Sequence, residues 1–369
     1  MGDVNPIVLD NGTGFCRAGF AGSEQPFISG RCAVGHSFGT TSDVDQPSST
    51  CFVGKDLVSK RPNVRISYPM KNGIVTEWEH MQCIWEHIFL NEMKVDPSNH
   101  SILITEAPLN PKSNRETMAE VMFDIFNVPA LYVAIPSVLT LYSLSRTSGL
   151  VLDCGEGVTS VVPIQDGYAL AHAIMRQNLA GRDVTHYLGH LLRSHTMQFP
   201  GHDKEEIIRE LKEAMSYLKP KACEVTSTSD LMATYILPDG NMIKLGCERF
   251  QCAEALFNPS LMGVEAYGVH ELVHSSVAKC DTDIRRNLFA NVILTGGSTI
   301  ISGFDCRIHG DLSRMAPPSV KVEIVTPSER PCSAWIGGSI LASLSLFGNM
   351  CITKKEYEES GSGILHTLL

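Results

Sequence analysis

Short apolar runs that are typical of buried strands alternate along this chain with segments of helical periodicity. The strand-like runs include PIVLD, SILITEA, ALYVAI, GLVLDCG, SVVPIQ, ANVILTGG and VKVEIVT. Helical patterns lie between them, in HMQCIWEHIFLNEM, SNRETMAEVMFDIF and DKEEIIRELKEAMSYL. This alternation predicts an α/β fold. A length of 369 residues suggests two domains or one large bilobal unit.

Three segments carry more specific predictions. Pro136 stands where a strand runs into a helix; its missing N–H suits the first helical turn, and Ile135 before it should be extended. The charged run DKEEIIREL (203–211) predicts a helix face that is mostly exposed to solvent. The apolar segment 334–352 is rich in Gly and Ser and contains Asn349, so we expect a buried helix rather than a membrane span.

One short plan occurs twice, in IVLDNGTG (7–14) and LVLDCGEG (150–157): an apolar strand, an Asp, then glycines at alternate positions. Each copy predicts a sharp hairpin whose glycines let the backbone approach an anion and whose N–H groups can form a phosphate-binding nest. Asp10 and Asp153 could hold a hydrated Mg²⁺. A third element, LTGGSTIISG (294–303), could accommodate a nucleoside. An ordinary tight turn explains either copy alone, whereas two copies suggest a duplicated domain that clamps a nucleotide phosphate.

Composition removes several classes of function. The formal net charge of −10 and the lack of a compact basic run argue against direct nucleic-acid binding and against binding to anionic membranes. The twelve cysteines include no CxxC pair, and the N-terminus has no signal-peptide pattern. We therefore expect reduced thiols in a cytoplasmic or nuclear protein.

With these three elements, the segments AGFAGSEQP, LITEAPLNPKSNRE, FNVPALYVAI, NLAGRDVT, LPDG, CDTDIRRNLFAN and AWIGGSILASLS resemble actin and the actin-related proteins over essentially the whole chain. The resemblance implies the actin/Hsp70/sugar-kinase ATPase fold, in which two RNase-H-like lobes surround a cleft for ATP or ADP with Mg²⁺. It implies an outer lobe of 1–143 plus 332–369 with a small subdomain at 32–68. The inner lobe would be 144–331, with a small subdomain at 180–264.

The resemblance also implies which residues bind the cofactor. Asp10 and Asp153 match the two aspartates that hold Mg²⁺ through water. The full set of matching cofactor-binding positions is Asp10, Thr13, Gly14, Phe15, Arg17, Asp153, Glu156, Gly157, Val158, Gly181, Arg209, Lys212, Glu213, Gly296, Gly297, Ser298 and Ile300. Thr13, Arg17 and Glu156 replace the Ser, Lys and Asp of conventional actin.

Two substitutions bear on catalysis. In actin, the positions of Pro136 and Ser160 carry a glutamine and a histidine that orient and support the attacking water. Phosphoryl transfer depends largely on positioning and charge stabilisation. Proline offers no polar side-chain group, and serine is too short to replace an imidazole. We therefore expect no intact catalytic pair, and nucleotide binding with little or no hydrolysis. Pro331 also replaces a lysine beside the adenine.

Within the family the chain is most similar to the centractins, the filament subunits of dynactin. This implies a subunit of a filament or multiprotein complex in the cytoplasm and cytoskeleton, or in the nucleus, with actin-family proteins, other cytoskeletal proteins and dynactin-like subunits as candidate partners. Conventional actin and the actin-related subunit of the branching complex are the alternatives, and so is an ATP-hydrolysing actin that polymerises on its own. Ser42 and Asp43 replace apolar residues at a filament contact, where burying an unpaired Asp would be costly.

Histidines at helical spacing raise one further alternative. His186 and His190 lie at i, i+4, and His80, Cys83 and His87 share another predicted helix face. Zinc binding is conceivable at such spacing, but neither set has the Glu of HExxH or a clear outside ligand. We expect these histidines to lie on helix surfaces or to be packed.

Overall fold

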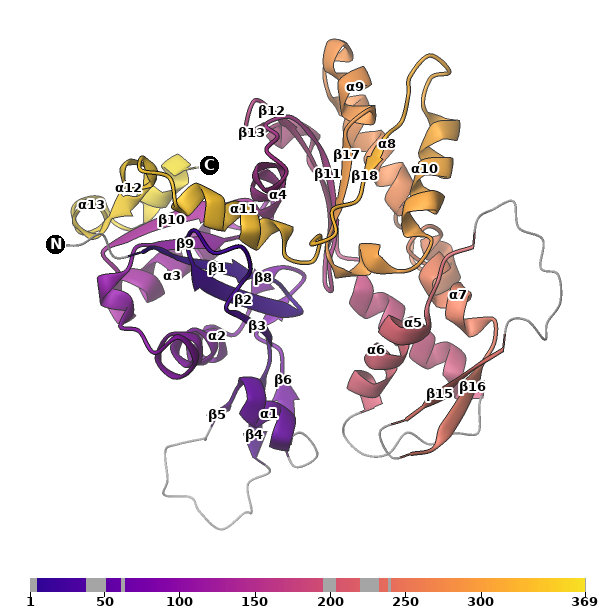
Figure 1. Ribbon diagram of the computed structural model, residues 1–369, viewed down its shortest axis with the longest axis horizontal. Helices are drawn as coiled ribbons and strands as arrows, with labels where there is room; N and C mark the ends of the chain where they lie inside the picture. Colours follow the sequence, from indigo (N-terminus) through magenta and orange to yellow (C-terminus); the bar gives the residue numbers. More distant parts are fainter. Residues whose placement is uncertain are drawn as a thin grey trace. The chain divides into compact units, whose positions relative to one another are not determined.

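The computed structural model describes residues 5–37, 51–60, 64–194, 204–219, 232–237 and 240–368. The chain divides into two compact units, and both are discontinuous in sequence. Unit 1 comprises Met1–Thr147, Asp166–Tyr168 and Glu329–Leu369; unit 2 comprises Ser148–Gln165 and Ala169–Ser328. Helices and mixed sheets occur in both units (Figure 1), which confirms the predicted α/β fold.

The main sheet of unit 1 has the strand order β19-β10-β9-β1-β2-β3. The β10-β9-β1 core is parallel, and the flanking strand pairs are antiparallel. The strands are β1 (Ile7–Asn11), β2 (Phe15–Phe20), β3 (Ile28–Arg31), β9 (Ile102–Thr105), β10 (Ala130–Ala134) and β19 (Ile352–Thr353). β1 and β9 are buried on both faces, so their sequences are continuously apolar rather than alternating.

Helices cover both faces of this sheet. Ile7 and Leu9 belong to one buried cluster with residues of α2 and α3, whereas Val8 between them belongs to a second cluster with residues of α4 and α11. The helices are α2 (Trp78–Glu86), α3 (Lys112–Glu120), α4 (Pro136–Ser143), α11 (Ser333–Ala342), α12 (Phe347–Met350) and α13 (Lys354–Ser360). The first two continue as π-helical turns, η2 (His87–Met93) and η4 (Val121–Ile125), and the chain ends in the 3₁₀ segment η10 (Ser362–Leu368).

A small sheet of order β5-β4-β6 also belongs to unit 1. It consists of β4 (Val34–Ser37), β5 (Cys51–Phe52) and β6 (Val64–Ser67), and α1 (Gly54–Lys60) follows β5. The short pair β7 (Met70–Lys71) and β8 (Ile74–Val75) connects this region to α2. Ser42 and Asp43 lie outside the described residues.

Unit 2 repeats the hairpin-and-parallel-strand plan of unit 1. Its main sheet has the order β13-β12-β11-β17-β18, with β14 paired to β12. The strands are β11 (Gly149–Cys154), β12 (Thr159–Gln165), β13 (Tyr168–Ala169), β14 (Met175–Gln177), β17 (Val292–Thr295) and β18 (Ile324–Val325). β11 is antiparallel to β12 and parallel to β17, as β1 is to β2 and β9. The predicted pair of Asp–Gly hairpins is therefore confirmed.

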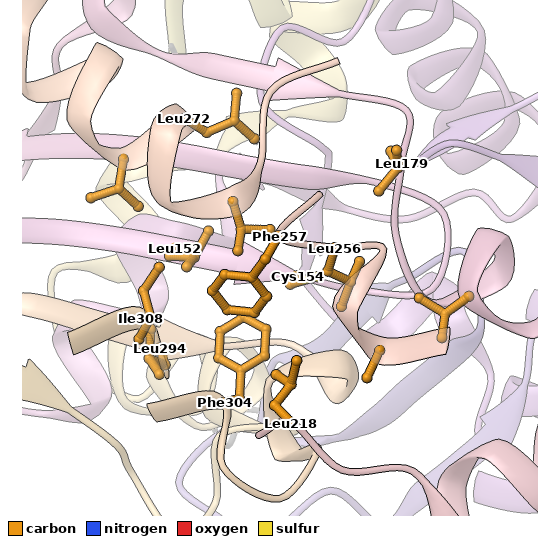
Figure 2. Close-up of a cluster of buried hydrophobic side chains, with 14 of the residues drawn as sticks. Leu152, Cys154, Leu179, Leu218, Leu256, Phe257, Leu272, Leu294, Phe304 and Ile308 are labelled. Carbon is orange, nitrogen blue, oxygen red and sulfur yellow. The ribbon is translucent and has the colours of Figure 1, made fainter. Parts of the chain in front are cut away.

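The core of unit 2 lies between this sheet and its helices. Figure 2 shows Leu152 and Leu294 from the sheet beside Phe304 and Ile308, and the rings of Phe257 and Phe304 meet edge to face at 5.3 Å. The helices are α5 (Gly181–Leu191), α6 (Lys204–Met215), α7 (Glu248–Glu254), α8 (Val269–Lys279), α9 (Thr282–Phe289) and α10 (Phe304–Met315). A two-stranded hairpin pairs β15 (Ala233–Ile236) with β16 (Met242–Leu245), and short 3₁₀ turns of unit 2 occupy Ala171–Ala173, Leu192–Ser194, Pro259–Met262 and Gly297–Ile300. A further 3₁₀ turn, Pro97–Asn99, belongs to unit 1.

Local structure agrees with the sequence pattern at the start of α4 and in segment 334–352, but not in segment 320–326. Pro136 begins α4, and Ile135 before it is extended, as predicted. Segment 334–352 contributes the largely buried helix α11 and then turns into α12. None of the helices in the described parts of the chain is both long and apolar enough to cross a bilayer. The predicted strand VKVEIVT is shorter than expected, because only Ile324–Val325 pairs with β17.

Candidate nucleotide site

In unit 1, the β1–β2 hairpin places Asp10 at the end of a buried strand. Thr105 donates its hydroxyl to Asp10 Oδ1 at 2.9 Å, and Arg17 Nη1 lies 3.4 Å from Asp10 Oδ2. The carboxylate is therefore oriented by a hydroxyl and faced by one positive charge. Thr13 accepts a hydrogen bond from the Gly73 N–H at 2.8 Å, which fixes the turn against the β7–β8 loop.

The turn of this hairpin combines glycine with two guanidinium groups. The Gly12 N–H donates to the Phe15 carbonyl at 2.9 Å, and a Cβ on Gly12 would lie only 2.8 Å from that oxygen. The guanidinium groups of Arg17 and Arg31 lie 5.7 and 5.0 Å from the centre of the Phe15 ring. Arg17 Nε is buried and has no hydrogen-bond partner within the protein. A buried donor without a partner in a positively charged turn fits an anionic ligand.

In unit 2, the β11–β12 hairpin and the third glycine element meet. The Gly155 N–H donates to the Val158 carbonyl and closes the turn. Gly296 has φ +86°, and a Cβ there would lie 2.4 Å from Asp153 Oδ1, so the third element passes directly beside this carboxylate. Ser298 donates its hydroxyl to the Gly155 carbonyl at 2.7 Å and ties the two loops together. Segments 150–157 and 294–303 therefore lie side by side within unit 2.

The first residue of α5, Gly181, and Lys212 of α6 contact the turn of the β11–β12 hairpin. The Gly181 N–H donates to the Gly155 carbonyl, and a Cβ on Gly181 would lie 2.5 Å from Ser298 Oγ. Lys212 Nζ donates to the Gly181 carbonyl at 2.9 Å and lies 3.7 Å from Glu156 Oε2. Position 181 requires glycine because three polar segments approach its backbone closely. Lys212 is buried, so its charge is compensated within the protein by a carbonyl and a carboxylate.

The charged run 203–211 is exposed only in part: Lys204 and Glu205 are exposed, as predicted, whereas Glu206 and Arg209 are buried. Asp203 lies outside the described residues. Glu206, Arg209 and Lys212 are all buried, and Arg209 forms ion pairs with Glu206 and with the exposed Glu213. Burial alone would lower the pKa of Arg209, but the hydrogen bond and charge of Glu206 raise it above its ordinary value. Charged side chains can be buried here because they compensate one another, which a hydropathy pattern does not show.

The other predicted residues divide between the two units. Gly14 and Phe15 belong to the first hairpin of unit 1. In unit 2, Gly157 and Val158 form the second turn, Gly297 opens the 3₁₀ turn, and Ile300 in that turn is exposed. A Cβ on Gly297 would meet no atom within 4 Å, so this glycine faces open space.

Pro136 and Ser160 lie in different units. Pro136 is the first residue of α4, and its only polar group, the carbonyl, accepts a hydrogen bond from Thr140 Oγ1 at 3.0 Å within the helix. Ser160 is buried in β12, directly opposite Asp153 in the β11–β12 register. Neither position carries an amide or imidazole group.

Sequence reasoning missed Thr105 and Asn11. Thr105 accepts a hydrogen bond from the Asn11 N–H and donates to Asp10, and the Asn11 side chain accepts from Trp85 Nε1 at 3.1 Å. The available signal was positional: Thr105 ends the strand-like run SILIT, and this strand is parallel to β1, which carries Asp10 and Asn11 at its end.

The histidines of the zinc alternative have other contacts. His80 Nδ1 lies 2.5 Å from a Glu77 carboxylate oxygen, His87 pairs with Glu92, and His186 pairs with Glu205. No group of three or more His, Cys, Asp or Glu side chains suited to a metal ion occurs within the described ranges.

These features define a class of protein: a two-unit α/β protein in which each unit contains a β-hairpin with an Asp followed by a Gly-rich turn. The family model for Actin matches residues 1–368. The chain therefore belongs to the actin family, and its fold is the actin ATPase fold. Proteins of this family generally bind ATP or ADP with a divalent cation, generally bind cytoskeletal partners, and are typically cytoplasmic or cytoskeletal. In unit 1, the buried Arg17 Nε without a partner within the protein fits the anionic phosphates of such a cofactor.

Proposed function

We propose that this chain is a nucleotide-binding actin-related protein that hydrolyses ATP weakly or not at all. It would act as a subunit of a filament or multiprotein complex, with the centractins as its nearest functional counterparts and dynactin-like subunits among its partners. One contrast carries the proposal: both hairpins keep the groups suited to phosphate and Mg²⁺, whereas Pro136 and Ser160 lack the groups that position water.

The residues proposed to bind Mg²⁺ and the nucleotide follow from the chemistry of their side chains and backbone groups. Asp10 and Asp153 would hold Mg²⁺ through water, since this ion prefers carboxylate and water oxygens. Backbone N–H groups of both hairpins, with Arg17, would face the phosphates, and the glycines of 294–303 would leave room for the nucleoside. Arg209, Lys212 and Glu213 would border the adenosine. Bound Mg²⁺ would neutralise part of the negative charge of the phosphates. The lobes around this site would be 1–143 plus 332–369 and 144–331.

Loss of hydrolysis follows from what the two substituted side chains can do. A proline at the first position of α4 cannot donate or accept a hydrogen bond with its side chain, so it cannot hold a water. Ser160 can form a hydrogen bond but cannot accept a proton as an imidazole can. In this fold the attacking water must be oriented, because positioning accounts for much of the rate. Nucleotide would thus serve chiefly as a ligand that stabilises the fold.

The direct test restores the missing groups. The double variant Pro136→Gln, Ser160→His is compared with the wild type in single-turnover phosphate release at matched ATP occupancy. We expect a gain on the order of 10²-fold or more, since positioned groups of this kind contribute about 10²–10⁴ in rate. Each single variant should gain less, because such groups act as a unit. Ser160 is buried, so a thermal scan must first show that the variant is folded.

A single result would contradict the proposal. If the wild type already releases phosphate as fast as a conventional actin, the chain is an active ATPase.

A second measurement tests self-assembly. Sedimentation of the pure protein at micromolar concentration in Mg²⁺ and salt should leave most of it soluble. Long filaments under those conditions would favour a self-polymerising actin instead.

A further inference from the structure

Two cysteines from different elements of unit 1 bring their sulfur atoms into contact. The Cys83 thiol on α2 lies 3.7 Å from Cys51 Sγ on β5. Both residues are half-buried, and both carry free thiols. A disulfide has an S–S length of about 2.05 Å, so the two sulfur atoms need to approach by roughly 1.7 Å to bond. Contact and partial exposure together make this pair accessible to a small oxidant.

We propose that Cys51 and Cys83 are a redox modification site that forms a reversible disulfide by exchange with a small-molecule disulfide of the glutathione class. The Cys51 thiolate attacks one sulfur of glutathione disulfide, which forms a mixed disulfide and releases one glutathione thiol. Cys83 then attacks the Cys51 sulfur, which releases the second glutathione. Two protein thiols are oxidised, one small disulfide is reduced, and the two protein protons end on the two glutathione molecules.

The surroundings of the pair support this order of attack. His36 lies opposite Cys51 in the β4–β5 register, so both side chains project from the same face of the small sheet. Burial lowers the pKa of His36, so its ring stays neutral and places no positive charge that would repel a cationic reagent or fix the Cys51 thiolate in an ion pair. The pKa of Cys83 is raised to about 11, chiefly by burial and then by its contact with Cys51, so Cys83 suits the second, intramolecular step.

A second pair of neighbouring cysteines shows why exposure matters. Cys16 and Cys32 interact electrostatically, but both are fully buried, and burial raises the pKa of Cys16 well above its ordinary value. A dissolved disulfide cannot reach these sulfur atoms in the folded protein. Cys247 and Cys306 in unit 2 are exposed, so each should report whether the reagent is active.

The consequence of oxidation would be a covalent link between two parts of unit 1. Cys51 belongs to the small sheet β5-β4-β6, whereas Cys83 lies on a helix that covers the main sheet (Figure 1). The link would close the loop between residues 51 and 83. It would restrict opening of the small sheet away from α2 in the oxidised state and leave it unrestricted in the reduced state.

The test uses the full chain at pH 8.5 in glutathione disulfide, followed by alkylation of remaining thiols, non-reducing trypsin digestion and mass spectrometry. We expect peptide 32–55 linked to peptide 72–94, with fragmentation placing the bond at Cys51 rather than Cys32. The link should disappear on addition of excess reduced thiol. Oxidation should raise the Tm by roughly 5–10 °C, because closing a loop of this length constrains the unfolded chain.

Three variants separate the proposal from general oxidation. Cys83→Ser should leave Cys51 as a mixed disulfide with glutathione and abolish the Tm increase, and Cys51→Ser should abolish both the link and the increase. Cys306→Ser should keep both. The proposal is overturned if Cys247 and Cys306 acquire glutathione while wild-type Cys51 and Cys83 stay reduced. It is also overturned if wild-type Cys51 retains glutathione beside a reduced Cys83, or if the link forms only in denaturant.

Discussion

At the scale of single residues, Arg307 shows how unit 2 accommodates a buried charge. Its guanidinium donates to Asp311 at 2.8 Å and to both carboxylate oxygens of Glu254 at 2.6 Å, and it lies 4.8 Å from the centre of the Phe257 ring. Burial acts to lower the pKa of Arg307, but the hydrogen bonds of Glu254 and Asp311 outweigh it and raise the pKa. The cation is held in place by two carboxylates and a ring face.

We predict that Arg307→Met destabilises the protein by about 3–5 kcal/mol, because it leaves the buried Asp311 without one of its compensating charges. Arg314 provides a matched control: it also pairs with Asp311, but its own side chain is 57% exposed. Arg314→Met should cost no more than about 1 kcal/mol. Urea unfolding of the two variants measures the difference, and equal losses would contradict this account of the buried pair.

At the scale of elements, the crossing of α4 and α11 depends on glycine. A Cβ on Gly337 would lie 1.7 Å from the Leu139 carbonyl oxygen, and one on Gly338 would lie 2.9 Å from Val8 Cγ1. The backbone of α11 therefore packs directly on the backbone of α4. The sequence WIGGSILASLS indicated a buried helix, but nothing local to it indicated what approaches Gly337.

We predict that Gly337→Ala lowers stability by about 3 kcal/mol or more, because the added methyl group overlaps backbone that cannot rotate away. The direction of the stability change distinguishes the two effects, because helix propensity alone would make Gly337→Ala stabilising by up to about 1 kcal/mol. Gly348→Ala on α12 is the control, because a Cβ there meets no atom within 4 Å. A thermal scan in which both variants melt with the wild type would refute the close crossing.

Helices α5 and α6 are joined by a pair with a defined pH dependence. The hydrogen bond to Glu205 raises the pKa of His186, and the same bond lowers the pKa of Glu205. The histidine contribution is complete below its ordinary pKa of 6.5 and is lost as pH rises through the raised value. The glutamate contribution is complete above its ordinary 4.5 and is lost as pH falls through the lowered value.

We therefore expect His186→Gln to destabilise the protein most between about pH 4.5 and 6.5. Both side chains are more than half exposed, so the effect should be only about 0.5 kcal/mol, or roughly 1–2 °C in Tm. His190→Gln on the same helix is the comparison. A Tm difference for His186→Gln that is larger at pH 8.5 than at pH 5.5 would reverse the assigned sign.

The sequence predicted those elements correctly whose structure is determined by residues adjacent in the chain. The two Asp–Gly hairpins and the Pro136 helix start follow from a few adjacent residues, so the pattern indicated them correctly. The burial of Lys212 depends on the Gly181 carbonyl 31 positions away, and the orientation of Asp10 depends on Thr105 at a separation of 95. Such contacts exist only after strands and helices have assembled, so apolar periodicity indicated neither of them. The π-helical ends of α2 and α3 had no recognisable local signal either.

At the scale of the whole molecule, each unit contributes one Asp–Gly hairpin, so we expect ligand binding to depend on both. Addition of Mg-ATP or Mg-ADP should raise the Tm, since a ligand of the native state stabilises it by mass action. Asp10→Ala and Asp153→Ala should each reduce nucleotide occupancy and most of this increase, whereas the exposed Asp305→Ala should not. Unchanged occupancy in both variants, assayed on the purified protein, would sink the proposed Mg²⁺ role.

The discontinuity of unit 1 has a consequence for synthesis. Its first strand emerges early from the ribosome, but β19, which completes the sheet, and Trp335, which donates to the Val8 carbonyl at 3.1 Å, come from the final segment of the chain. The residues assigned to unit 2 are all translated before that segment, Glu329–Leu369. During translation, Val8 of β1 and Leu103 of β9 must therefore wait for Trp335 of α11, more than 200 residues downstream, with apolar surface exposed that favours aggregation. The unit that begins synthesis first is the one that completes its fold last.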